Sequence, residues 1–252
     1  MSLELRAVGM RFGDLEVLEG LEVRCESGEF VAVVGPSGCG KSTLLRIVAG
    51  LEPPSSGEVL YGGAAVRGPG AERALVQQER ALYPWLTLEA SVAMGLELAR
   101  RPRREARQMA RAWLARVGLE GFEGYYPHQV SGGMAQRAAL AQVLAVETRL
   151  LLLDEPFGSL DALTRLGLQA MLQRLWAELG FGAVMVTHDV EEALYLADRV
   201  VVLSPRPARV LANLRVGLPR PRGRDAPGFV SLRREVLALL GVQTEAETPR
   251  RR

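Results

Sequence analysis

Four residues in the first part of the chain have the types and the spacing that bind phosphate groups. Gly35, Gly40, Lys41 and Ser42 fit the pattern G-x4-G-K-[ST] in the stretch GPSGCGKS. Glycines let successive backbone N–H groups point into one concave anion nest, and the start of a following helix adds positive potential. We expect Lys41 to contact the β- and γ-phosphates of a nucleotide and the Ser42 hydroxyl to bind Mg²⁺. The other candidate nucleotide contacts in this stretch are Pro36, Ser37, Gly38, Cys39 and Thr43.

Lys41 is also the only lysine in the chain, whose other long basic side chains are all arginines. A biased genome explains the arginine excess simply, because Ile47 and Asn213 are likewise the only residues of their types. A lysine that persists in such a chain indicates a position where arginine does not serve, because the planar guanidinium of arginine is larger than an ammonium and prefers bidentate partners. The composition therefore singles out the residue on which the phosphate pattern depends.

Two adjacent carboxylates supply the second part of a nucleotide-hydrolysing site. Asp154 and Glu155 directly follow four leucines in LLLLDEP, a run typical of a strand buried on both faces. One acid there could cap the next element, whereas two at the carboxyl edge of an open α/β sheet indicate a site. We expect Asp154 to bind Mg²⁺ through water and Glu155 to act as general base toward the attacking water.

The elements that must position these residues alternate between strands and helices. The apolar run Phe30–Val34 predicts a buried strand before the glycine-rich turn, and a helix is expected over Lys41–Ala49. After LLLLDEP come a helix from about Ala162 to Leu179, the strand GAVMVTHD, a helix in VEEALYLA and the strand RVVVLS. This order favours an α/β fold with a parallel sheet, and with the phosphate pattern it predicts a P-loop NTPase (RecA-like) core.

Two further parts are predicted around this core. LELRAV and EVLEGLEVRC predict an antiparallel β subdomain, GEVLYGG and RALVQQ read as further strands, and residues 87–145 are expected to form a helical subdomain. We expect the ATPase domain to span residues 1–215. Residues 216–252 are expected to contain a linker at Pro219–Gly228, a short helix in FVSLRREVLALLG and a disordered tail, TEAETPRRR.

The composition excludes several classes of protein. Hydrophobic residues make up 48% and charged residues 24% of the 252, which is typical of a globular protein, and the net charge of +2 does not indicate a nucleic-acid binder. Cys25 and Cys39 have no metal-ligand spacing and fit a reducing cytosol. The sequence shows no signal-peptide pattern and no run approaching the roughly 18 apolar residues of a membrane-spanning helix. If the protein acts at a membrane, another chain must supply the spanning part.

A further motif narrows the class of nucleotide-binding protein. The stretch HQVSGGMAQRAALAQVLA places SGG before a predicted helix, which gives a second amino terminus able to receive an anion. Here the sequence resembles the ATP-binding subunits of ABC transporters, whose signature LSGGQ appears as VSGGM. The other family elements follow in order, with Gln78 in the Q-loop VQQE, SLD as the D-loop and the switch histidine His188 in VTHD. The resemblance covers about residues 3–215.

This resemblance implies an ATPase that works as a homodimer, with each ATP bound between the P-loop of one subunit and the signature of the other. His188 would contact the γ-phosphate and help to orient water. Gln78 would bind Mg²⁺ and take part in catalysis, although Gln77 directly before it leaves the assignment open between the two. Phe12 stands where an aromatic ring stacks on adenine in the family, and a core position is its alternative. The residues implied to contact the partner's nucleotide are Ser131, Gly132, Gly133 and Asp161.

A closer resemblance connects the chain with the ATPases of nitrate, sulfonate and taurine importers. It rests on GPGAER, LYPWLT and DEPFGSLDALTR, and on the short C-terminal stretch in place of a long regulatory domain. It implies that Tyr83, Pro84 and Trp85 contact transmembrane permease subunits, and that a periplasmic or lipoprotein solute-binding protein is an indirect partner. The protein would then lie at the cytoplasmic face of the inner (plasma) membrane. Departures such as Met134 in the signature and Gln142 in the following helix remove no group that touches phosphate or Mg²⁺.

Two other functions fit parts of the sequence. A soluble ABC ATPase of DNA repair, translation or iron–sulfur assembly would share the motifs, but the chain has neither zinc insertions nor a second cassette. A P-loop kinase or GTPase explains neither VSGGM nor VTHD. We expect no nucleic-acid partner, and the arginines of LARRPRREARQMAR favour a solvated helix face over a surface for phosphates or lipid headgroups.

Overall fold

Two sheets of different kinds form the framework of the molecule. The structure is a computed structural model and describes residues 1–77 and 82–242. Within these residues an antiparallel sheet has the order β2-β1-β4-β5, and a mixed sheet has the order β10-β9-β3-β8-β7-β6. The strands are β1 (Leu3–Phe12), β2 (Leu15–Cys25), β3 (Phe30–Val34), β4 (Ser56–Tyr61), β5 (Ala64–Ala65), β6 (Arg73–Val76), β7 (Leu150–Asp154), β8 (Gly182–Thr187), β9 (Arg199–Leu203) and β10 (Val210–Arg215).

Helices cover both faces of the mixed sheet, and several begin or end at residues suited to that position. Thr87, Ser131, Asp161 and Asp189 cap four helices through side-chain oxygens that accept backbone N–H groups. The helices are α1 (Lys41–Ala49), α2 (Leu88–Leu98), α3 (Arg103–Arg116), the 3₁₀ turn η1 (Pro127–Gln129), α4 (Gly132–Leu144), α5 (Ala162–Leu179), α6 (Val190–Leu196) and α7 (Pro227–Leu239).

Strands β9, β3, β8, β7 and β6 run parallel as neighbours in the mixed sheet, and only β10 at its edge is antiparallel. Because parallel strands end on the same side, the loops that follow these strands meet at one edge. The apolar runs that the sequence contains are explained by burial on both faces: every residue of β3 and β8 is buried.

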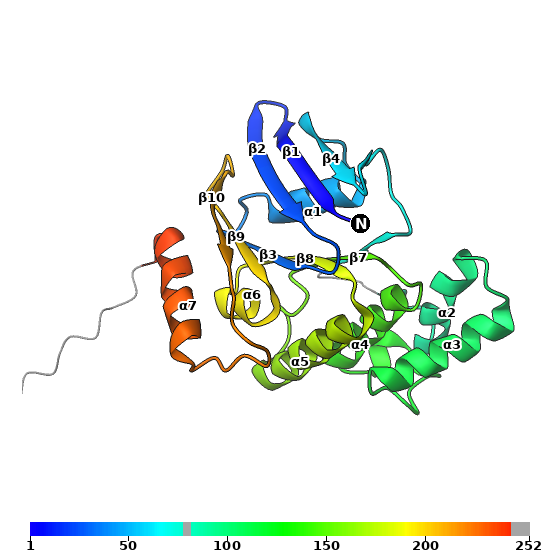
Figure 1. Cartoon of the computed structure of the whole chain (residues 1–252). Helices are drawn as coiled ribbons and strands as arrows, with labels where there is room; N and C mark the ends of the chain where they lie inside the picture. Colours follow the sequence, from blue (N-terminus) through cyan, green and yellow to red (C-terminus); the bar gives the residue numbers. More distant parts are fainter. Residues whose placement is uncertain (78–81, 243–252) are drawn as a thin grey trace, which may run out of the picture.

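The two faces of the mixed sheet belong to different cores. Val31 and Val33 of β3 pack with α1 and the antiparallel sheet, whereas Phe30, Ala32 and Val34 pack with the helices of the other face. Helix α1 therefore lies between the two sheets, with α2 to α6 below the mixed sheet and α7 at the side of β10 (Figure 1). The start of α1 lies beside the end of β3, since Lys41 donates to the carbonyl of Gly35 directly after that strand.

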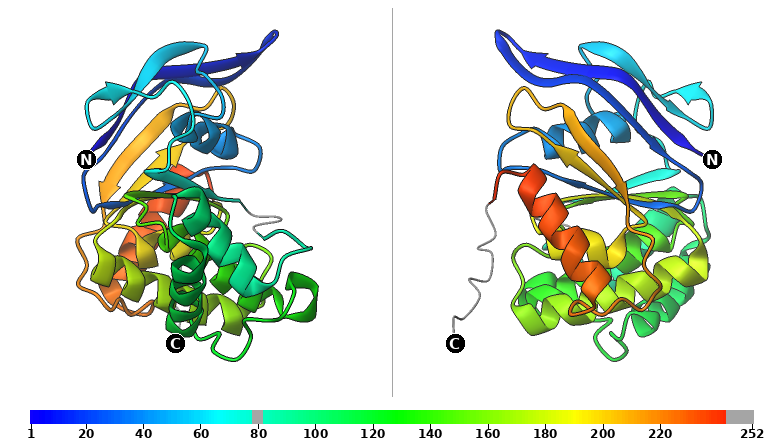
Figure 2. Two further views of the ribbon diagram at one scale, coloured as in Figure 1. Left: turned by 90° about the vertical axis from the view of Figure 1, so that its right-hand side faces the viewer. Right: turned by 60° about the vertical axis from the view of Figure 1, so that its left-hand side comes forward.

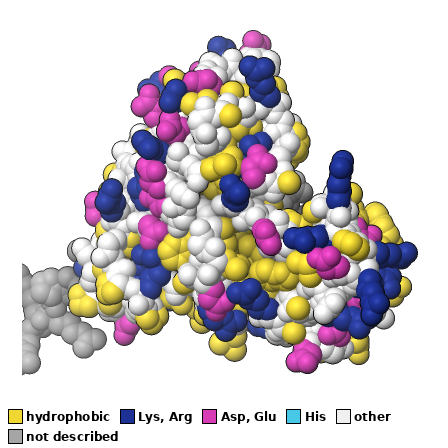
Figure 3. Space-filling view, turned by 45° about the vertical axis from the view of Figure 1, so that its right-hand side comes forward, with side chains coloured by type: hydrophobic (Ala, Val, Ile, Leu, Met, Phe, Trp, Pro, Cys, Tyr) yellow, Lys and Arg dark blue, Asp and Glu magenta, His cyan; other side chains and the backbone are white. Residues whose placement is uncertain are grey.

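Helices α2, α3 and α4 form the helical part expected at about 87–145, and α2 and α3 project beyond one side of the mixed sheet (Figure 1). Its arginine-rich surface is visible in Figure 3, where dark blue side chains gather over this end of the molecule. Several of these arginines pair with acids, including Arg101 with Glu105 and both Arg107 and Arg111 with Glu89. These exposed pairs are what a solvated helix face provides.

The segment 216–226, which connects β10 to α7, is fixed to the core by arginines. The Arg222 guanidinium is buried and donates to the carbonyls of Leu194 and Ala197, both at 2.6 Å, and burial lowers its pKa to about 10. Phe229 and Val236 of α7 are fully buried in the same core. The stretch expected to be a linker thus makes buried contacts, while the predicted tail, 244–252, lies outside the described residues.

Among residues 1–77 and 82–242, no helix combines the length and apolar character that crossing a bilayer requires.

Candidate active site

Lys41 begins α1 and is held by the loop that precedes it. Its ammonium donates to the carbonyl oxygens of Gly35 at 2.8 Å and Pro36 at 3.0 Å, and the side chain is only 5% exposed. A buried ammonium needs such partners because an unpaired one carries a large desolvation cost. The lysine is thereby fixed beside the N–H groups at the start of α1, as an anion site requires.

Gly40 is required by both conformation and space. Its φ of 118° lies in the region that favours glycine, and a Cβ there would stand 2.7 Å from Leu18 Cδ2 and 2.8 Å from Val17 Cγ1. The antiparallel sheet therefore presses directly on the phosphate loop. Any other residue at this position would have to displace the Leu18 and Val17 side chains of β2 and also adopt the strained backbone conformation.

Ser42 and Asp154 bring two oxygen donors together from separate elements. The Ser42 hydroxyl donates to Asp154 Oδ1 at 2.9 Å, and burial raises the pKa of Asp154, partly offset by this hydrogen bond. A hydroxyl and a carboxylate are hard oxygen ligands of the kind Mg²⁺ prefers, and Mg²⁺ usually completes its shell with water and substrate phosphates. The pair fits that ion, and the part of the chain described here offers no cluster of three or more acids, histidines or cysteines for a dedicated metal cage.

Glu155 and His188 lie at the ends of adjacent strands and touch. His188 Nδ1 is 3.0 Å from Glu155 Oε2, and the two residues directly follow β7 and β8. Glu155 has a φ of 43°, unusual for a residue with a side chain, and its N–H donates to the Val186 carbonyl at 3.0 Å. Such backbone strain, about 1–3 kcal/mol, is typical of residues whose side chains are aimed for function.

A buried acid behind His188 was not found from the sequence. The Thr187 hydroxyl donates to Glu192 Oε2 and accepts the N–H of Asp189 at 3.0 Å, so it ties α6 to both sides of His188. Glu192 is 3% exposed, and burial raises its pKa to about 7. In VEEALYLA nothing distinguishes the buried Glu192 from its half-buried neighbour Glu191, because both are acids in the first turn of the helix.

A cavity of about 360 Å³ lies over the phosphate loop. Phe12 and Leu15 line one side, Lys41 and Glu155 lie within it, and Arg206 closes another side. Phe12 is 48% exposed, so it is not a core residue and its ring is available to a ligand. The remaining lining residues are Val17, Ser37, Gly38, Gly40, Ser42 and Thr43. Arg206 was also missed by sequence reasoning, because no motif contains it.

The signature residues do not line this cavity. Ser131 caps α4 by accepting the Met134 N–H at 3.3 Å, and Asp161 caps α5 by accepting the Thr164 N–H at 3.0 Å, which lowers the pKa of Asp161. Gly133 packs against the start of α5, because a Cβ there would stand 2.3 Å from Thr164 Cγ2. The two helix starts thus form one surface, separate from Lys41.

A family model described as "ABC transporter" matches residues 18–158 of the chain. The chain belongs to the ABC transporter family. The resemblance seen in the sequence is therefore confirmed, and so is the predicted fold class of a P-loop core with an antiparallel β subdomain and a helical subdomain.

Two relatives and one solved structure show how similar this member of the ABC transporter family is to other proteins in sequence and in fold. It is 45% identical over 238 residues to the taurine import ATP-binding protein TauB of Chromobacterium violaceum, with 91% of each chain covered. It is 41% identical over 225 residues to the aliphatic sulfonates import ATP-binding protein SsuB of Bacillus cereus, covering 89% of this chain and 88% of the relative. The structure titled "Dimeric Structure of MJ0796, a Bacterial ABC Transporter Cassette" matches with a TM-score of 0.76 and 30% identity, over 88% of this chain and 99% of that one.

Two expectations for this ABC transporter protein concern the segment after β6. Gln78 lies outside the described residues, so its expected contact with Mg²⁺ and its catalytic role stay predictions, and Gln77 is exposed. Tyr83 and Trp85 are 44% and 69% exposed, with ring centroids 5.3 Å apart, and Pro84 between them is exposed as well. They form an aromatic surface without a cover in the described part of the chain.

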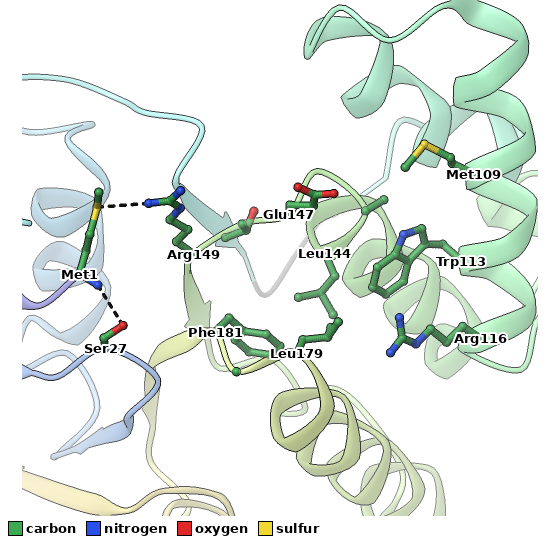
Figure 4. A pocket seen from close by; sticks show the side chains of 13 residues that line it. Met1, Ser27, Met109, Trp113, Arg116, Leu144, Glu147, Arg149, Leu179 and Phe181 are labelled. Atoms are coloured by element: carbon green, nitrogen blue, oxygen red, sulfur yellow. Dashed lines mark hydrogen bonds between the residues drawn. The ribbon is translucent and has the colours of Figure 1, made fainter.

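A second cavity of this ABC transporter protein, about 560 Å³, lies far from the phosphate loop (Figure 4). Arg149 and Phe181 line it and directly precede β7 and β8, which places it at the amino-terminal edge of the mixed sheet. Met109 and Trp113 of α3 close its other side. It therefore belongs to the boundary between the helical part and the core, and not to the candidate active site.

Proposed function

We propose that this chain is the ATP-hydrolysing subunit of an ABC importer for nitrate, a sulfonate, taurine or a similar small solute. The observation that carries the proposal is the meeting of three pairs at one sheet edge: Lys41 with its phosphate loop, Ser42 with Asp154, and Glu155 with His188. These are the groups needed to bind a triphosphate and to activate water against it.

Nucleotide binding follows from the geometry of the loop. The N–H groups from Ser37 to Thr43 and the start of α1 would receive the phosphates, and Lys41 would place its charge on the β- and γ-phosphates. Phe12 lies on the side of the same cavity, where its exposed ring can stack on adenine.

Ser42 and Asp154 would hold Mg²⁺, Ser42 directly and Asp154 through water, with Gln78 as the expected third protein group. When bound, this ion neutralises charge on the phosphate oxygens. The Ser42–Asp154 hydrogen bond keeps both oxygens at one place, so that little rearrangement is needed to receive the ion.

Hydrolysis would depend on Glu155 as general base. His188 engages Oε2, which leaves Oε1 to accept the proton of an attacking water. The bond from His188 would fix the carboxylate, and the strained backbone of Glu155 would aim it into the cavity. The exposed His188 would itself contact the γ-phosphate.

A second copy of the chain would complete the site. Ser131, Gly132, Gly133 and Asp161 lie outside the cavity that Lys41 lines, so we propose that they act on the nucleotide of the partner subunit. A similar structure is titled as a dimeric cassette, which supports this arrangement. The start of α4 then supplies N–H groups and helix-dipole potential to the γ-phosphate from the other side.

The importer role is supported by relatives that are named for taurine and sulfonate import. We propose that the exposed segment Tyr83–Trp85 contacts transmembrane permease subunits, and that a periplasmic or lipoprotein solute-binding protein delivers the solute to them. The chain would then work as a peripheral protein at the cytoplasmic face of the plasma membrane.

The proposal is tested with the purified chain in MgATP. We expect the wild type to release phosphate and Lys41→Ala to release none. If the wild type hydrolyses no ATP, either alone or together with its permease, the proposed ATPase function is wrong. The solute is tested separately, by titrating the cognate solute-binding protein with nitrate, taurine and alkanesulfonates. Binding of none of them would overturn the proposed solute class and leave the ATPase function standing.

A further inference from the structure

The loop 204–209 after β9 reaches the phosphate loop from the side opposite to Glu155. Strand β9 is the direct neighbour of β3, so its carboxyl end lies beside the start of the phosphate loop. Arg206 lines the cavity with Phe12 and Lys41, and its Nη2 atom lies 3.1 Å from the position that a Cβ on Gly38 would occupy. A guanidinium thus lies at the rim of the nest that receives phosphates.

Arg206 is carried by a rigid loop. The Ser204 N–H donates to the Arg209 carbonyl at 3.0 Å, and the Arg209 N–H returns to the Ser204 hydroxyl at 2.9 Å, which closes the loop at its base. Ala208 exchanges two backbone hydrogen bonds with β2, at 2.9 Å to Val17 and 3.0 Å from Glu19. The tip of the β9–β10 hairpin therefore lies beside β2, as Figures 1 and 2 show.

The side chain of Arg206 makes no contact that a structural role would need. It is exposed, and within residues 1–77 and 82–242 it forms no ion pair and donates no side-chain hydrogen bond. Arg209 on the same loop differs, because it pairs with Glu19 and does not line the cavity. An arginine whose backbone is fixed beside an anion site, and whose guanidinium has no acidic partner, has its charge and donors free for a ligand.

We propose that Arg206 is a further nucleotide-binding residue, whose guanidinium contacts the phosphate chain of the bound nucleotide. This inference rests on the proposed function and adds a second cation beside Lys41. Lys41 reaches the phosphates from inside the loop, as a point charge, whereas Arg206 reaches them from the rim with a planar fork. Its expected effect is on affinity, because a contact made to bound phosphate before and during hydrolysis stabilises both states.

The test measures nucleotide affinity of the purified full-length chain by calorimetric titration with ATP and ADP, at two or more salt concentrations. Arg206→Ala is expected to weaken the binding of both nucleotides about tenfold, as one charge-assisted hydrogen bond does, and to make the affinity less dependent on salt. Arg206→Lys is expected to retain part of the affinity. Arg209→Ala is the matched control and is expected to bind both nucleotides as the wild type does. The melting temperature of Arg206→Ala is expected to equal that of the wild type, which shows that the variant is folded.

Three outcomes overturn the inference. In the first, Arg206→Ala binds ATP as tightly as the wild type while Lys41→Ala has lost binding. This result rejects the role of Arg206 and leaves the proposed function intact. Weaker binding with an unchanged salt dependence rejects a contact with phosphate. A wild type that binds no nucleotide rejects the inference together with the proposed function on which it rests.

Discussion

The His188 ring and the Glu155 carboxylate are 3.0 Å apart, at the ends of two neighbouring parallel strands. Neither residue could reach the other without the pairing of β7 with β8, since 33 positions separate them in the chain. The contact engages one carboxylate oxygen and leaves the other for water.

Glu155→Gln is expected to bind ATP and to lose hydrolysis. The amide keeps an oxygen for His188 but cannot accept a proton from water, so turnover should fall by about 100-fold or more. An ATP-bridged dimer should then accumulate, which size-exclusion chromatography with and without ATP detects. Normal phosphate release by this variant would exclude Glu155 as the general base.

Lys41→Arg is expected to slow turnover strongly, even though the rest of the chain uses arginine. The carbonyls of Gly35 and Pro36 hold a compact ammonium at 2.8 and 3.0 Å, and the wider guanidinium does not fit between them and the phosphates. A loss of about 100-fold in the hydrolysis rate is expected. The reverse exchange Arg46→Lys is the control on the same helix, where Arg46 pairs with Glu52 at the surface, and it should behave as the wild type does.

Gly133→Ala is expected to destabilise the fold by about 1–3 kcal/mol, because its methyl group would stand 2.3 Å from Thr164 Cγ2. Gly132→Ala meets nothing nearer than 3.6 Å and should unfold at nearly the wild-type temperature. Thr164→Ser removes the clashing methyl group, so Gly133→Ala combined with Thr164→Ser should regain most of the loss. Thermal unfolding measures all four proteins, and a double variant no more stable than Gly133→Ala would disprove the steric cause.

Glu192→Gln is expected to remove part of the pH dependence of stability. The unfolded carboxyl loses its proton near its ordinary pKa of 4.5, whereas burial keeps it protonated in the folded state up to about 7. The folded state therefore binds more protons in this window, and the free energy of unfolding falls as the pH rises from about 4.5 to about 7. The contribution is about 3 kcal/mol, complete below 4.5 and lost above 7.

The charged groups that face Glu192 are Asp189, which raises the pKa further, and Arg165, which opposes it; the hydrogen bond from the Thr187 hydroxyl also opposes it. Chemical denaturation at several pH values should show the wild type losing stability relative to Glu192→Gln across the window. Glu235→Gln, at an exposed position of α7, is the control and should follow the wild type. Parallel curves for wild type and Glu192→Gln would contradict the prediction.

The parts of the structure that local patterns determine could be predicted from the sequence. The buried strand Phe30–Val34 and the helices Lys41–Ala49 and Ala162–Leu179 have the predicted limits, because apolar runs, glycine turns and caps mark both ends. The contact of Ser42 with Asp154 at one sheet edge also agrees with the rule for parallel strands, whose carboxyl ends lie together.

The parts that long-range pairing determines could not be predicted. Arg206 joins the cavity only because β9 lies beside β3, an order that no local pattern reveals. The exposure of Phe12 depends on how the β1–β2 hairpin lies over the phosphate loop. The Pro-, Gly- and Arg-rich stretch read as a linker is fixed by Arg222, whose partners are carbonyls 25 to 28 positions away in the chain.

The single lysine has a practical consequence for chemistry on this protein. Amine-selective reagents have one side-chain target in the whole sequence, the Nζ atom of Lys41, in addition to the terminal amine. That atom lies in the nucleotide cavity at 5% exposure of its residue, hydrogen-bonded to two carbonyls. The rate at which mass spectrometry finds a label on its peptide therefore reports whether the cavity is filled, with no tag, dye or substitution introduced into the chain.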